Sequence, residues 1–460
     1  MTTDAFSPVK IIVPCGSLGA GVREEEIEYG LAKGAQAIAS DAGSTDSGAA
    51  YLATGKSKNS RGAVKRDLTI LMKAHAKAGI PVIVGTSGQA GGDLNVDWTR
   101  DILLEVVKEL GISPKIALLY SEQSKDGVKA LNAEGRITPL PPLGPLEDET
   151  VESCDHIVAL MGVEPYVSAL EQGADVILGG RSTDPAVLAS FPIWKGAGWG
   201  PAWHAGKIGE CGVQCSVNPT LGSGVLLTVG RDRFEVEPLS ERNTCTPYSV
   251  SAHMLYENTN PYLLNEPGGQ LDVHGASYEQ DADGRSVRVS GAMWIPGTYT
   301  MKLEGAGGGQ YQTIMLVGIQ DPDVLQDVSG FHDRFLQVLY ARARQTLSPE
   351  EEDDFHISLR MYGWNAVDGA DVPEGTPIPR EIGVLFIATA RTQELANSIA
   401  HACNPYFFHY PAVMNKELPS YGFPFTPADI PRGQVYEFKL NHVVEVEDPL
   451  QLVRTVWVNS

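Results

Sequence analysis

The sequence predicts an α/β protein with an N-terminal doubly wound, mainly parallel sheet and a C-terminal α+β domain. Two observations carry this prediction. In the first 190 residues, short β-branched runs alternate with helical stretches, which is typical of parallel βα units. Several of these runs are apolar at successive positions, as expected for strands that helices cover on both faces.

Six runs in this first part have the composition of buried strands, and a loop of small or polar residues follows each. The predicted strands are Val9–Pro14, Ala35–Ser40, Pro81–Gly85, Lys115–Tyr120, His156–Met161 and Ala174–Leu178. The clearest helices between them are predicted at Glu24–Lys33, Ala63–Ala78, Trp98–Leu110 and Val163–Gln172. Gly34, Gly111 and Gly173 occupy positions typical of helix C-caps. A barrel is the alternative topology, but only six clear units favour an open sheet.

The composition and the periodicity of the sequence change after about residue 190. Residues 191–222 are rich in Gly, Trp and Pro, and the chain from Gly224 to Gln320 is mainly β in character. The last part of the sequence predicts both strands and helices. The strands are expected at Ile357–Tyr362, Ile382–Thr389 and Val435–Val444, and the helices at Phe331–Gln345 and Gln393–Cys403. We therefore expect two domains, residues 1–222 and 223–460.

Charge and composition exclude several classes of partner. Acidic residues outnumber basic residues by 57 to 35, and the formal net charge is −22. This charge repels phosphate backbones and anionic lipids, so we expect neither nucleic acid nor a membrane as a partner. A small anionic metabolite remains a suitable ligand if local Arg, Lys or backbone N–H groups hold it. Six Cys residues are sparse, and neither a signal peptide nor a long apolar run is recognisable, so we expect a cytoplasmic location.

The loops after the six strands are the predicted binding site, because ligands of parallel α/β sheets bind outside the carboxyl ends of the strands. Turn formation or helix capping would explain any one of these loops, but six on one edge favour a site. The predicted substrate-binding residues are Ser17, Ser44, Thr45, Ser87, Gly88, Arg181, Ser182 and Thr183, with Arg360 and Asn365 from a later strand at a domain cleft. Arg181 is the predicted clamp for a carboxylate, with a structural salt bridge to Asp184 as the alternative.

Carboxylates on the same edge are candidates for acid/base and metal chemistry. Asp41 and Asp46 follow the second strand and are predicted to transfer protons, as carboxyl pairs with separated pKa values do. Asp93, Glu122 and Asp184 are the candidates for binding Mg²⁺, which prefers oxygen ligands. Ordinary N-capping is the alternative for Asp93 and Asp184.

The loop at residues 16–21 invites comparison with a dinucleotide-binding fingerprint. Its glycines fall at positions 16, 19 and 21, which differs from the G-x-G-x-x-G order of the Rossmann motif. Asp41 ends the next strand about 20 residues on, as a ribose-binding acid would. NAD is therefore not the expected cofactor, although nucleotide binding remains an alternative. Gly85–Gln89 does not match the G-x-S-x-G nucleophile motif.

Two further clusters lie beyond the sixth strand. Glu210 and Cys211 belong to a segment whose single C-x₃-C pair lacks the spacing of a zinc site. Glu210 is predicted as an acid or base, and buried structural thiols are the expected state of the cysteines. His253 and Glu257 are four residues apart in a segment expected to be helical, where the carboxylate would support His253 as a general base. A surface pair of the two residues, without a role in catalysis, is the alternative.

Eight segments form a set that is specific for one family. They are IIVPCGSLGAG, DAGSTDSG, GTSGQAGGD, MGVEP, GGRSTDPA, WHAGKIGECG, LYENTNPYLLNEPGGQLD and RMYGWN. On these segments the chain resembles the acyclic terpene utilisation family from near the N-terminus to about residue 405, as a sister branch of its terpene-cluster member. The resemblance implies a catabolic role, in organic-acid or acyl-CoA metabolism, and no particular reaction. Some relatives work beside or fused to a small second domain, which leaves open a separate small partner subunit for this chain. A homo-oligomer is also expected.

The leading hypothesis is an enzyme that acts on a small carboxylated metabolite, or on its CoA ester, by lyase, hydratase or isomerase chemistry. The abundance of acid/base candidates, without a convincing nucleophile or hydride-cofactor motif, favours this hypothesis. Arg181 and loop N–H groups would hold the anion, and Asp41, Asp46 or His253 would handle protons, with Mg²⁺ as a suitable helper. A nucleotide-cofactor enzyme and a non-catalytic metabolite-binding subunit are the alternatives.

Overall fold

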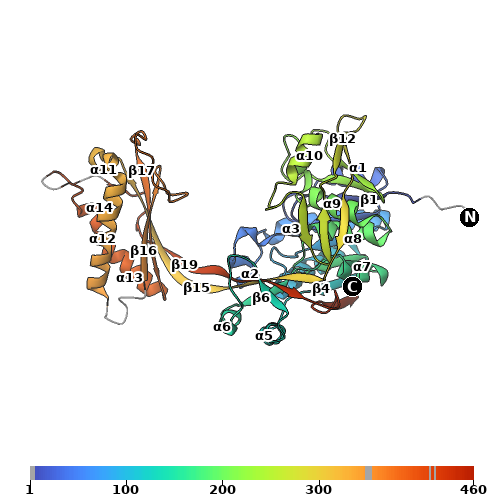
Figure 1. Ribbon diagram of the computed structural model, residues 1–460, viewed down its shortest axis with the longest axis horizontal. Helices are drawn as coiled ribbons and strands as arrows, with labels where there is room; N and C mark the ends of the chain where they lie inside the picture. Colours follow the sequence, from blue (N-terminus) through green and yellow to red (C-terminus); the bar gives the residue numbers. More distant parts are fainter. Residues whose placement is uncertain (1–5, 348–354, 414–415, 419–420, 460) are drawn as a thin grey trace, which may run out of the picture. The chain divides into compact units, whose positions relative to one another are not determined.

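The computed structural model describes residues 6–347, 355–413, 416–418 and 421–459 of the chain. The chain divides into two compact units (Figure 1). Unit 1 comprises Met1–Gly307 and Glu437–Ser460, and unit 2 comprises Gly308–Tyr436. The candidate site lies in unit 1, so this unit is described first.

A ten-stranded sheet forms the centre of unit 1, in the order β12-β13-β9-β8-β1-β2-β3-β7-β4-β20. Its five middle strands are parallel to one another: β1 (Val9–Val13), β2 (Ala37–Asp41), β3 (Val82–Gly85), β7 (Val176–Gly179) and β4 (Lys115–Tyr120). The outer strands are antiparallel: β8 (Val225–Val229), β9 (Arg233–Pro238), β13 (Val287–Ser290), β12 (Ser277–Gln280) and β20 (Arg454–Asn459). The predicted α/β class is confirmed, and antiparallel strands extend the parallel core on both sides.

Helices cover both faces of the parallel strands. Successive residues of β3 point to opposite faces, because Val82 and Val84 belong to one core cluster and Ile83 to another. The first cluster includes residues of α1 (Glu24–Ala32), α3 (Arg61–Ala78) and α4 (Asp93–Leu110). The second includes residues of α7 (Glu164–Glu171), α8 (Asp184–Trp194) and α9 (Trp199–Gly209). Both faces of the parallel sheet are therefore buried, which explains why the strands are apolar at consecutive positions.

One predicted strand takes a different position. The run at residues 156–161 does form a strand, β6 (His156–Ala159), but it pairs antiparallel with β15 (Thr300–Ile319) and lies outside the ten-stranded sheet. The expected parallel pairing of this strand is therefore corrected. A short apolar run fits either environment, and its partner is decided by long-range pairing.

The division into units differs from the expected boundary at 222/223. Strand β8, which begins at Val225, pairs with β1 along its whole length, and β9, β13 and β12 continue the same sheet. The compact units instead divide after Gly307 and after Tyr436. The sequence pattern changes near residue 190 because the connections become antiparallel, and this change does not mark a new core.

Smaller elements complete unit 1. They are the helices α2 (Ala50–Thr54), α5 (Lys125–Ala133), α6 (Asp148–Glu152) and α10 (Pro247–His253), the 3-10 turns η1 (Thr45–Ser47) and η2 (Gly212–Cys215), strand β5 (Ile137–Pro139), and a three-stranded sheet of β10 (Leu263–Glu266), β11 (Gly269–Asp272) and β14 (Met293–Pro296). Unit 1 also holds the first residues of β15 and the last residues of β19 (Ile430–Glu445). No helix among the described residues is long and apolar enough to cross a membrane.

Unit 2 is an α+β arrangement, as the end of the sequence predicts. Its sheet contains β16 (Phe355–Tyr362), β17 (Ile382–Ala390), part of β15 and the two-residue strand β18 (Tyr421–Gly422). The helices are α11 (Pro322–Gln326), α12 (Val328–Thr346), α13 (Gln393–Cys403) and α14 (Tyr406–His409). Helices α12 and α13 lie beside this sheet (Figure 1). Alternate residues of β17 are buried, and these belong to one core cluster with residues of α12 and α13.

Backbone packing brings the loops after β3 and β7 together at the carboxyl edge of the parallel strands. The N–H of Arg181 donates to the carbonyl of Gly91 at 3.0 Å. Gly91 has a φ of +68°, and a Cβ atom there would lie 2.3 Å from the Arg181 nitrogen. Glycine is required at this position on both grounds.

Candidate active site

A cleft opens at the carboxyl ends of the parallel strands. One cavity of about 340 Å³ is lined by the loops after β1 and β2 together with Asp184, Glu210, Cys211 and Glu257. A second cavity of about 360 Å³ also includes Asp184, Glu210 and Glu257. Because the two cavities share three carboxyl-bearing residues, we treat them as one cleft and call it the carboxylate cleft.

Backbone strain concentrates around this cleft. Thr86, Gln89 and Glu257 have positive φ angles of 45°, 88° and 58°, although none is glycine. Each such residue costs on the order of 1–3 kcal/mol, and strain of this kind clusters at functional sites. Gln89 and Glu257 line the carboxylate cleft.

Asp41 is the most deeply buried carboxyl group of the cleft. It ends β2, is 3% exposed, and its Oδ2 accepts a hydrogen bond from the N–H of Gly43 at 3.1 Å. Its Oδ1 is buried and has no hydrogen-bond partner among the residues that the structure describes. Burial, and next the charge of Asp184, raises the pKa of Asp41 well above its usual value. Asp41 therefore favours its protonated form more strongly than an ordinary aspartate does.

Asp46 has the opposite electrostatic setting. It lies exposed in η1, where its N–H donates to the Ser44 hydroxyl at 3.1 Å. A hydrogen bond between the carboxyl groups of Asp46 and Glu257 lowers the pKa of Asp46, while burial and the same contact raise the pKa of Glu257. Asp41 and Asp46 thus line one cavity with pKa values displaced in opposite directions, which is the pattern of an acid and base pair.

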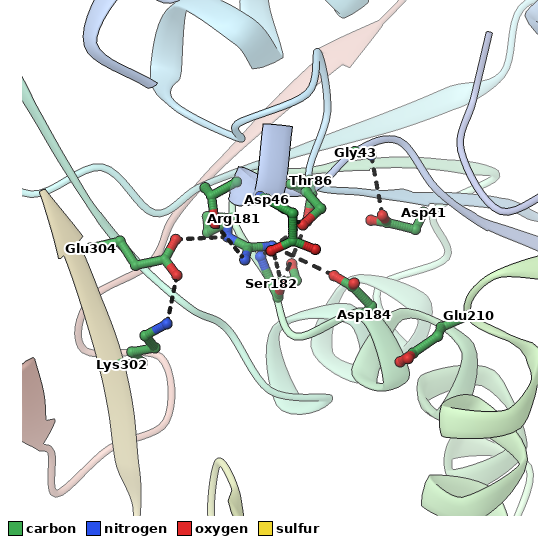
Figure 2. A network of polar contacts seen from close by, with 12 residues as sticks. Asp41, Gly43, Asp46, Thr86, Arg181, Ser182, Asp184, Glu210, Lys302 and Glu304 are labelled. Carbon is green, nitrogen blue, oxygen red and sulfur yellow. Dashed lines mark hydrogen bonds and ion pairs between the residues drawn. The ribbon is translucent and has the colours of Figure 1, made fainter. Parts of the chain in front are cut away.

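Arg181 lines the second cavity of the cleft and is held by protein groups (Figure 2). Its Nε donates to Glu304 at 3.1 Å, its Nη1 lies 3.5 Å from Asp184, and its Nη2 donates to the Thr45 hydroxyl at 3.3 Å. Glu304 also pairs with Lys302 at 2.8 Å. Burial alone would raise the pKa of Glu304, but the charges of Arg181 and Lys302 hold it down at about 2.

A second ion pair lies on the other side of Asp184. Lys207 of α9 is 5% exposed and pairs with Glu210, which is 4% exposed. Burial raises the pKa of Glu210 well above its usual value, even though Lys207 opposes the shift. Burial also raises the pKa of Asp184. Figure 2 shows Asp184 between Arg181 and Glu210, with its carboxyl group directed toward Arg181.

A larger groove continues from the carboxylate cleft. Its volume is about 900 Å³, and it shares Leu160, Thr183 and Glu266 with the second cavity of the cleft. Its apolar lining residues include Leu140, Leu160, Ile295, Pro296 and Val443. We call it the apolar groove after these residues; polar residues, among them Gln270, Lys302 and Asn441, line it as well.

Glu266 stands where the cleft and the apolar groove meet. Burial raises its pKa to about 7. The ordinary pKa of a glutamate, 4.5, applies to the unfolded chain, so between about pH 4.5 and pH 7 the folded protein keeps a proton on Glu266 that the unfolded chain has released. The free energy of unfolding therefore decreases as the pH rises through this window. Above that window, the full penalty of the buried charge remains.

A Glu266→Gln variant is expected to be more stable than the wild type at pH 8 and to gain little at pH 4. The shift corresponds to at most about 3 kcal/mol, and to less where solvent reaches the carboxyl group. Urea unfolding at the two pH values measures the difference. Glu279→Gln on the exposed face of β12 is the control, and equal pH dependence of the two variants would contradict the prediction.

The predicted substrate-binding residues take up four kinds of position. Ser17 and Ser44 line the carboxylate cleft, and Thr183 lines both its second cavity and the apolar groove. The side chains of Thr45 and Ser182 bond within the protein, to Arg181 and to Tyr166. Ser87 is fully buried, and Gly88 packs against Asn95. Arg360 and Asn365 belong to unit 2, where they donate to the carbonyls of Ala366 and Ala370.

The three candidate magnesium ligands fall into two places. The N–H of Asp93 donates to Glu122 at 2.7 Å, so these two residues are neighbours. Asp93 pairs with Arg454 at 2.9 Å, and Glu122 pairs with His156 at 2.6 Å. Asp184 belongs to the carboxylate cleft with Arg181. The first two carboxylates thus already have protein partners, the guanidinium of Arg454 for Asp93 and the imidazole of His156 for Glu122.

The expected helical pair of His253 and Glu257 does not form. Helix α10 ends at His253, and Glu257 has a left-handed backbone, so the two are not on one helix face. The helix gives way after His253 to tight turns, in which the N–H groups of Leu255 and Tyr256 donate to the carbonyls of Ala252 and His253, and the left-handed residue Glu257 follows them. Instead, His253 lies beside Glu210 and Cys211, with their ligand atoms within 4.8 Å of one another. Burial, and then Lys207, lowers the pKa of His253 to about 4.

The glycine loop after β1 already holds an internal anion. The N–H groups of Gly19 and Gly21 donate to Oδ2 of Asp67 at 2.8 and 3.2 Å, and that of Val22 donates to Oδ1 at 3.1 Å. Helix α1 then begins with Glu24, Glu25 and Glu26. A pyrophosphate would have to displace Asp67 and face three acidic residues, so this loop is poorly suited to a dinucleotide.

Sequence reasoning did not assign roles to Lys207, Glu304 or Lys58. Lys207 and Glu210 are three residues apart, which is a spacing that helix geometry brings together and that could have revealed the pair. Glu304 lies 123 positions from Arg181, and no local pattern connects them. Lys58 lines the carboxylate cleft and donates to the Ser47 hydroxyl at 3.1 Å.

Comparison with known proteins identifies the family. The family model described as "Acyclic terpene utilisation family protein AtuA" matches residues 37–218 and 237–435, which include the loops after β2, β3, β4 and β7 and the segments that hold Glu210, His253 and Glu304. No curated protein and no solved structure matches the chain. Since the match covers most of the chain, this protein belongs to the acyclic terpene utilisation family.

Proposed function

We propose that unit 1 is a proton-transfer enzyme, of the isomerase, hydratase or lyase type, that acts on a small carboxylated metabolite or its CoA ester. The observation that carries the proposal is the buried carboxyl group of Asp41, which has a raised pKa and an unpartnered oxygen, among the described residues, in a cleft shared with Asp46. An unpartnered buried polar atom needs an explanation, and a substrate atom supplies one.

The chemistry follows from the opposite states of the two aspartates. Asp46 is ionised and accepts a proton from a carbon next to the substrate carbonyl, which leaves the electron pair on the enolate. Asp41 is protonated and returns a proton to the substrate at the carbonyl oxygen or at another carbon. Acid and base groups of this kind contribute about 10²–10⁴ in rate.

The shape of the site supports a substrate with one polar end and one hydrocarbon end. Lys58 lies at the cleft and donates to a hydroxyl, with no carboxylate partner among the described residues, so its charge is available for a carboxylate or thioester. The apolar groove would take the hydrocarbon part. The family description, acyclic terpene utilisation, agrees with a branched aliphatic acid as the substrate class.

Solvent exchange tests the proposal whichever product the reaction gives. The full chain is incubated in deuterated water with a panel of branched unsaturated carboxylic acids and their CoA thioesters, and with saturated straight-chain analogues. We expect mass spectrometry to find deuterium, or a new mass, in at least one branched compound. Thermal stabilisation by a panel member without exchange or product would instead favour a metabolite-binding subunit, and neither effect across the panel would reject the proposed substrate class.

A further inference from the structure

Three residues with different ligand atoms meet at the edge of the carboxylate cleft. Glu210 is the C-cap residue of α9, Cys211 follows it before η2, and His253 is the last residue of α10. Their carboxylate oxygen, thiol sulfur and imidazole nitrogen lie within 4.8 Å of one another. His253 lies far from Cys211 in the chain, so the cluster is a product of the fold.

The imidazole of His253 lacks the partner that a buried ring normally has. His253 is 8% exposed, and its Nε2 is buried with no hydrogen-bond partner among the described residues. Leaving a buried polar atom unsatisfied costs on the order of 1–3 kcal/mol. The Tyr256 ring stacks on the imidazole with a centroid distance of 5.6 Å, which holds the ring in one orientation. A bound ion would satisfy the imidazole.

The donor set matches a transition metal of intermediate softness. Carboxylate, thiolate and imidazole are the three ligand types that zinc takes in proteins, and catalytic zinc sites have three protein ligands with one open position. Magnesium and calcium prefer oxygen ligands alone. In a tetrahedral site with bonds of about 2.0–2.3 Å, ligand atoms lie about 3.5 Å apart, so the three side chains need to close by roughly 1 Å.

Two of the three residues line the carboxylate cleft. Glu210 and Cys211 line the cavity that also holds Asp41. Lys207 pairs with Oε1 of Glu210, and the second carboxylate oxygen can bind the ion while this pair persists. The Cys211 thiol loses its proton to solvent when the metal–sulfur bond forms, so the affinity rises with pH.

We propose that Glu210, Cys211 and His253 form a binding site for one divalent transition metal ion of the zinc class, with its open position toward the carboxylate cleft. The site is separate from the proposed proton transfer, because neither Asp41 nor Asp46 belongs to it. It also gives Glu210 and His253, which the sequence nominates for acid/base work, a shared role as ligands.

Cobalt binding tests the site directly. The full chain is freed of metal with a chelator and titrated with Co²⁺ and then with Zn²⁺. We expect a thiolate-to-cobalt charge-transfer absorption that saturates at one ion per chain and is abolished by Zn²⁺. Cys211→Ser is expected to remove the charge-transfer band, and His253→Gln is expected to weaken Zn²⁺ binding by at least tenfold, since each removes one ligand.

Matched controls separate the site from other thiols and imidazoles. Cys154→Ser retains a hydroxyl that can donate to the Thr150 carbonyl, and His274→Ala removes an exposed ring that pairs with Asp272. Both are expected to bind Co²⁺ as the wild type does.

Absence of the charge-transfer band in the wild type, or its persistence in folded Cys211→Ser, would overturn the proposal. Circular dichroism checks each fold, and if Cys211→Ser does not fold, unchanged Zn²⁺ affinity in His253→Gln would also overturn it. Deuterium exchange by the metal-free protein reports separately on the proton-transfer function.

Discussion

Replacing Arg181 by methionine is expected to lower the free energy of unfolding of unit 1 by about 3–5 kcal/mol, because a buried ion pair that loses one partner leaves an uncompensated charge. The side chains of Arg181 and Glu304 are 8% and 6% exposed. Without the guanidinium, Glu304 keeps only Lys302 as a cation at contact distance among the described residues, and Asp184 loses its nearest one. The pKa values of Asp41 and Asp184 should rise further, since Arg181 opposes both shifts.

Tryptophan fluorescence during urea unfolding measures this loss, because every tryptophan except Trp364 lies in unit 1. Arg288→Met is the matched control: Arg288 pairs with Asp281 but is 43% exposed, and exposed pairs contribute at most about 1 kcal/mol. The double variant Arg181→Met with Glu304→Gln should recover part of the stability, because it also removes the charge of Glu304 that has lost its partner. Equal midpoints for Arg181→Met and Arg288→Met would show that the network does not stabilise the unit.

An Asp41→Asn variant is expected to lose about 10²- to 10⁴-fold in the rate of deuterium exchange or turnover, as expected when a general acid is removed. Its stability should stay close to that of the wild type. The raised pKa of Asp41, caused by burial and then by Asp184, favours the neutral carboxyl group, and an amide has nearly the same shape and no charge. Loss of activity without loss of stability therefore separates a chemical role from a structural one.

Glu235→Gln is the matched control for this variant. Burial, and then Asp281, also raises the pKa of Glu235, but this residue lies on β9 away from the carboxylate cleft. We expect Glu235→Gln to retain full activity. An Asp41→Asn variant that binds substrate and turns it over at the rate of Glu235→Gln would remove Asp41 from the proposed mechanism.

Local sequence patterns were sufficient for the elements that build the edge of the site. The observed β4 has the predicted bounds, and the bounds of β1, β2, β3 and β7 differ from the predicted ones by one or two residues. Each is a buried run ended by small or polar residues, and that signal lies within a few neighbouring positions. Because carboxyl ends of parallel strands share one edge, the position of Asp41 at the cleft also followed from the sequence.

Local patterns did not predict which strands pair with one another or which charged side chains meet. The predicted strand at His156–Met161 forms, but β15 rather than the parallel sheet supplies its partner. Arg181 was predicted to hold a substrate carboxylate, and the structure places Glu304 against it. Both outcomes depend on residues far away in the chain, where no periodicity carries information.

The sequence by itself determined the fold class, the succession along the chain of the strands and helices that build the parallel core, and the edge at which the acidic loops lie. These follow from side-chain periodicity and turn chemistry, which act over a few residues. Only the tertiary structure decided that Asp67 occupies the glycine loop, that Glu304 pairs with Arg181, and that His253 reaches Glu210 and Cys211. Those contacts join distant segments, and burial of charged and polar groups selects their partners because an unpaired group inside the protein costs several kcal/mol.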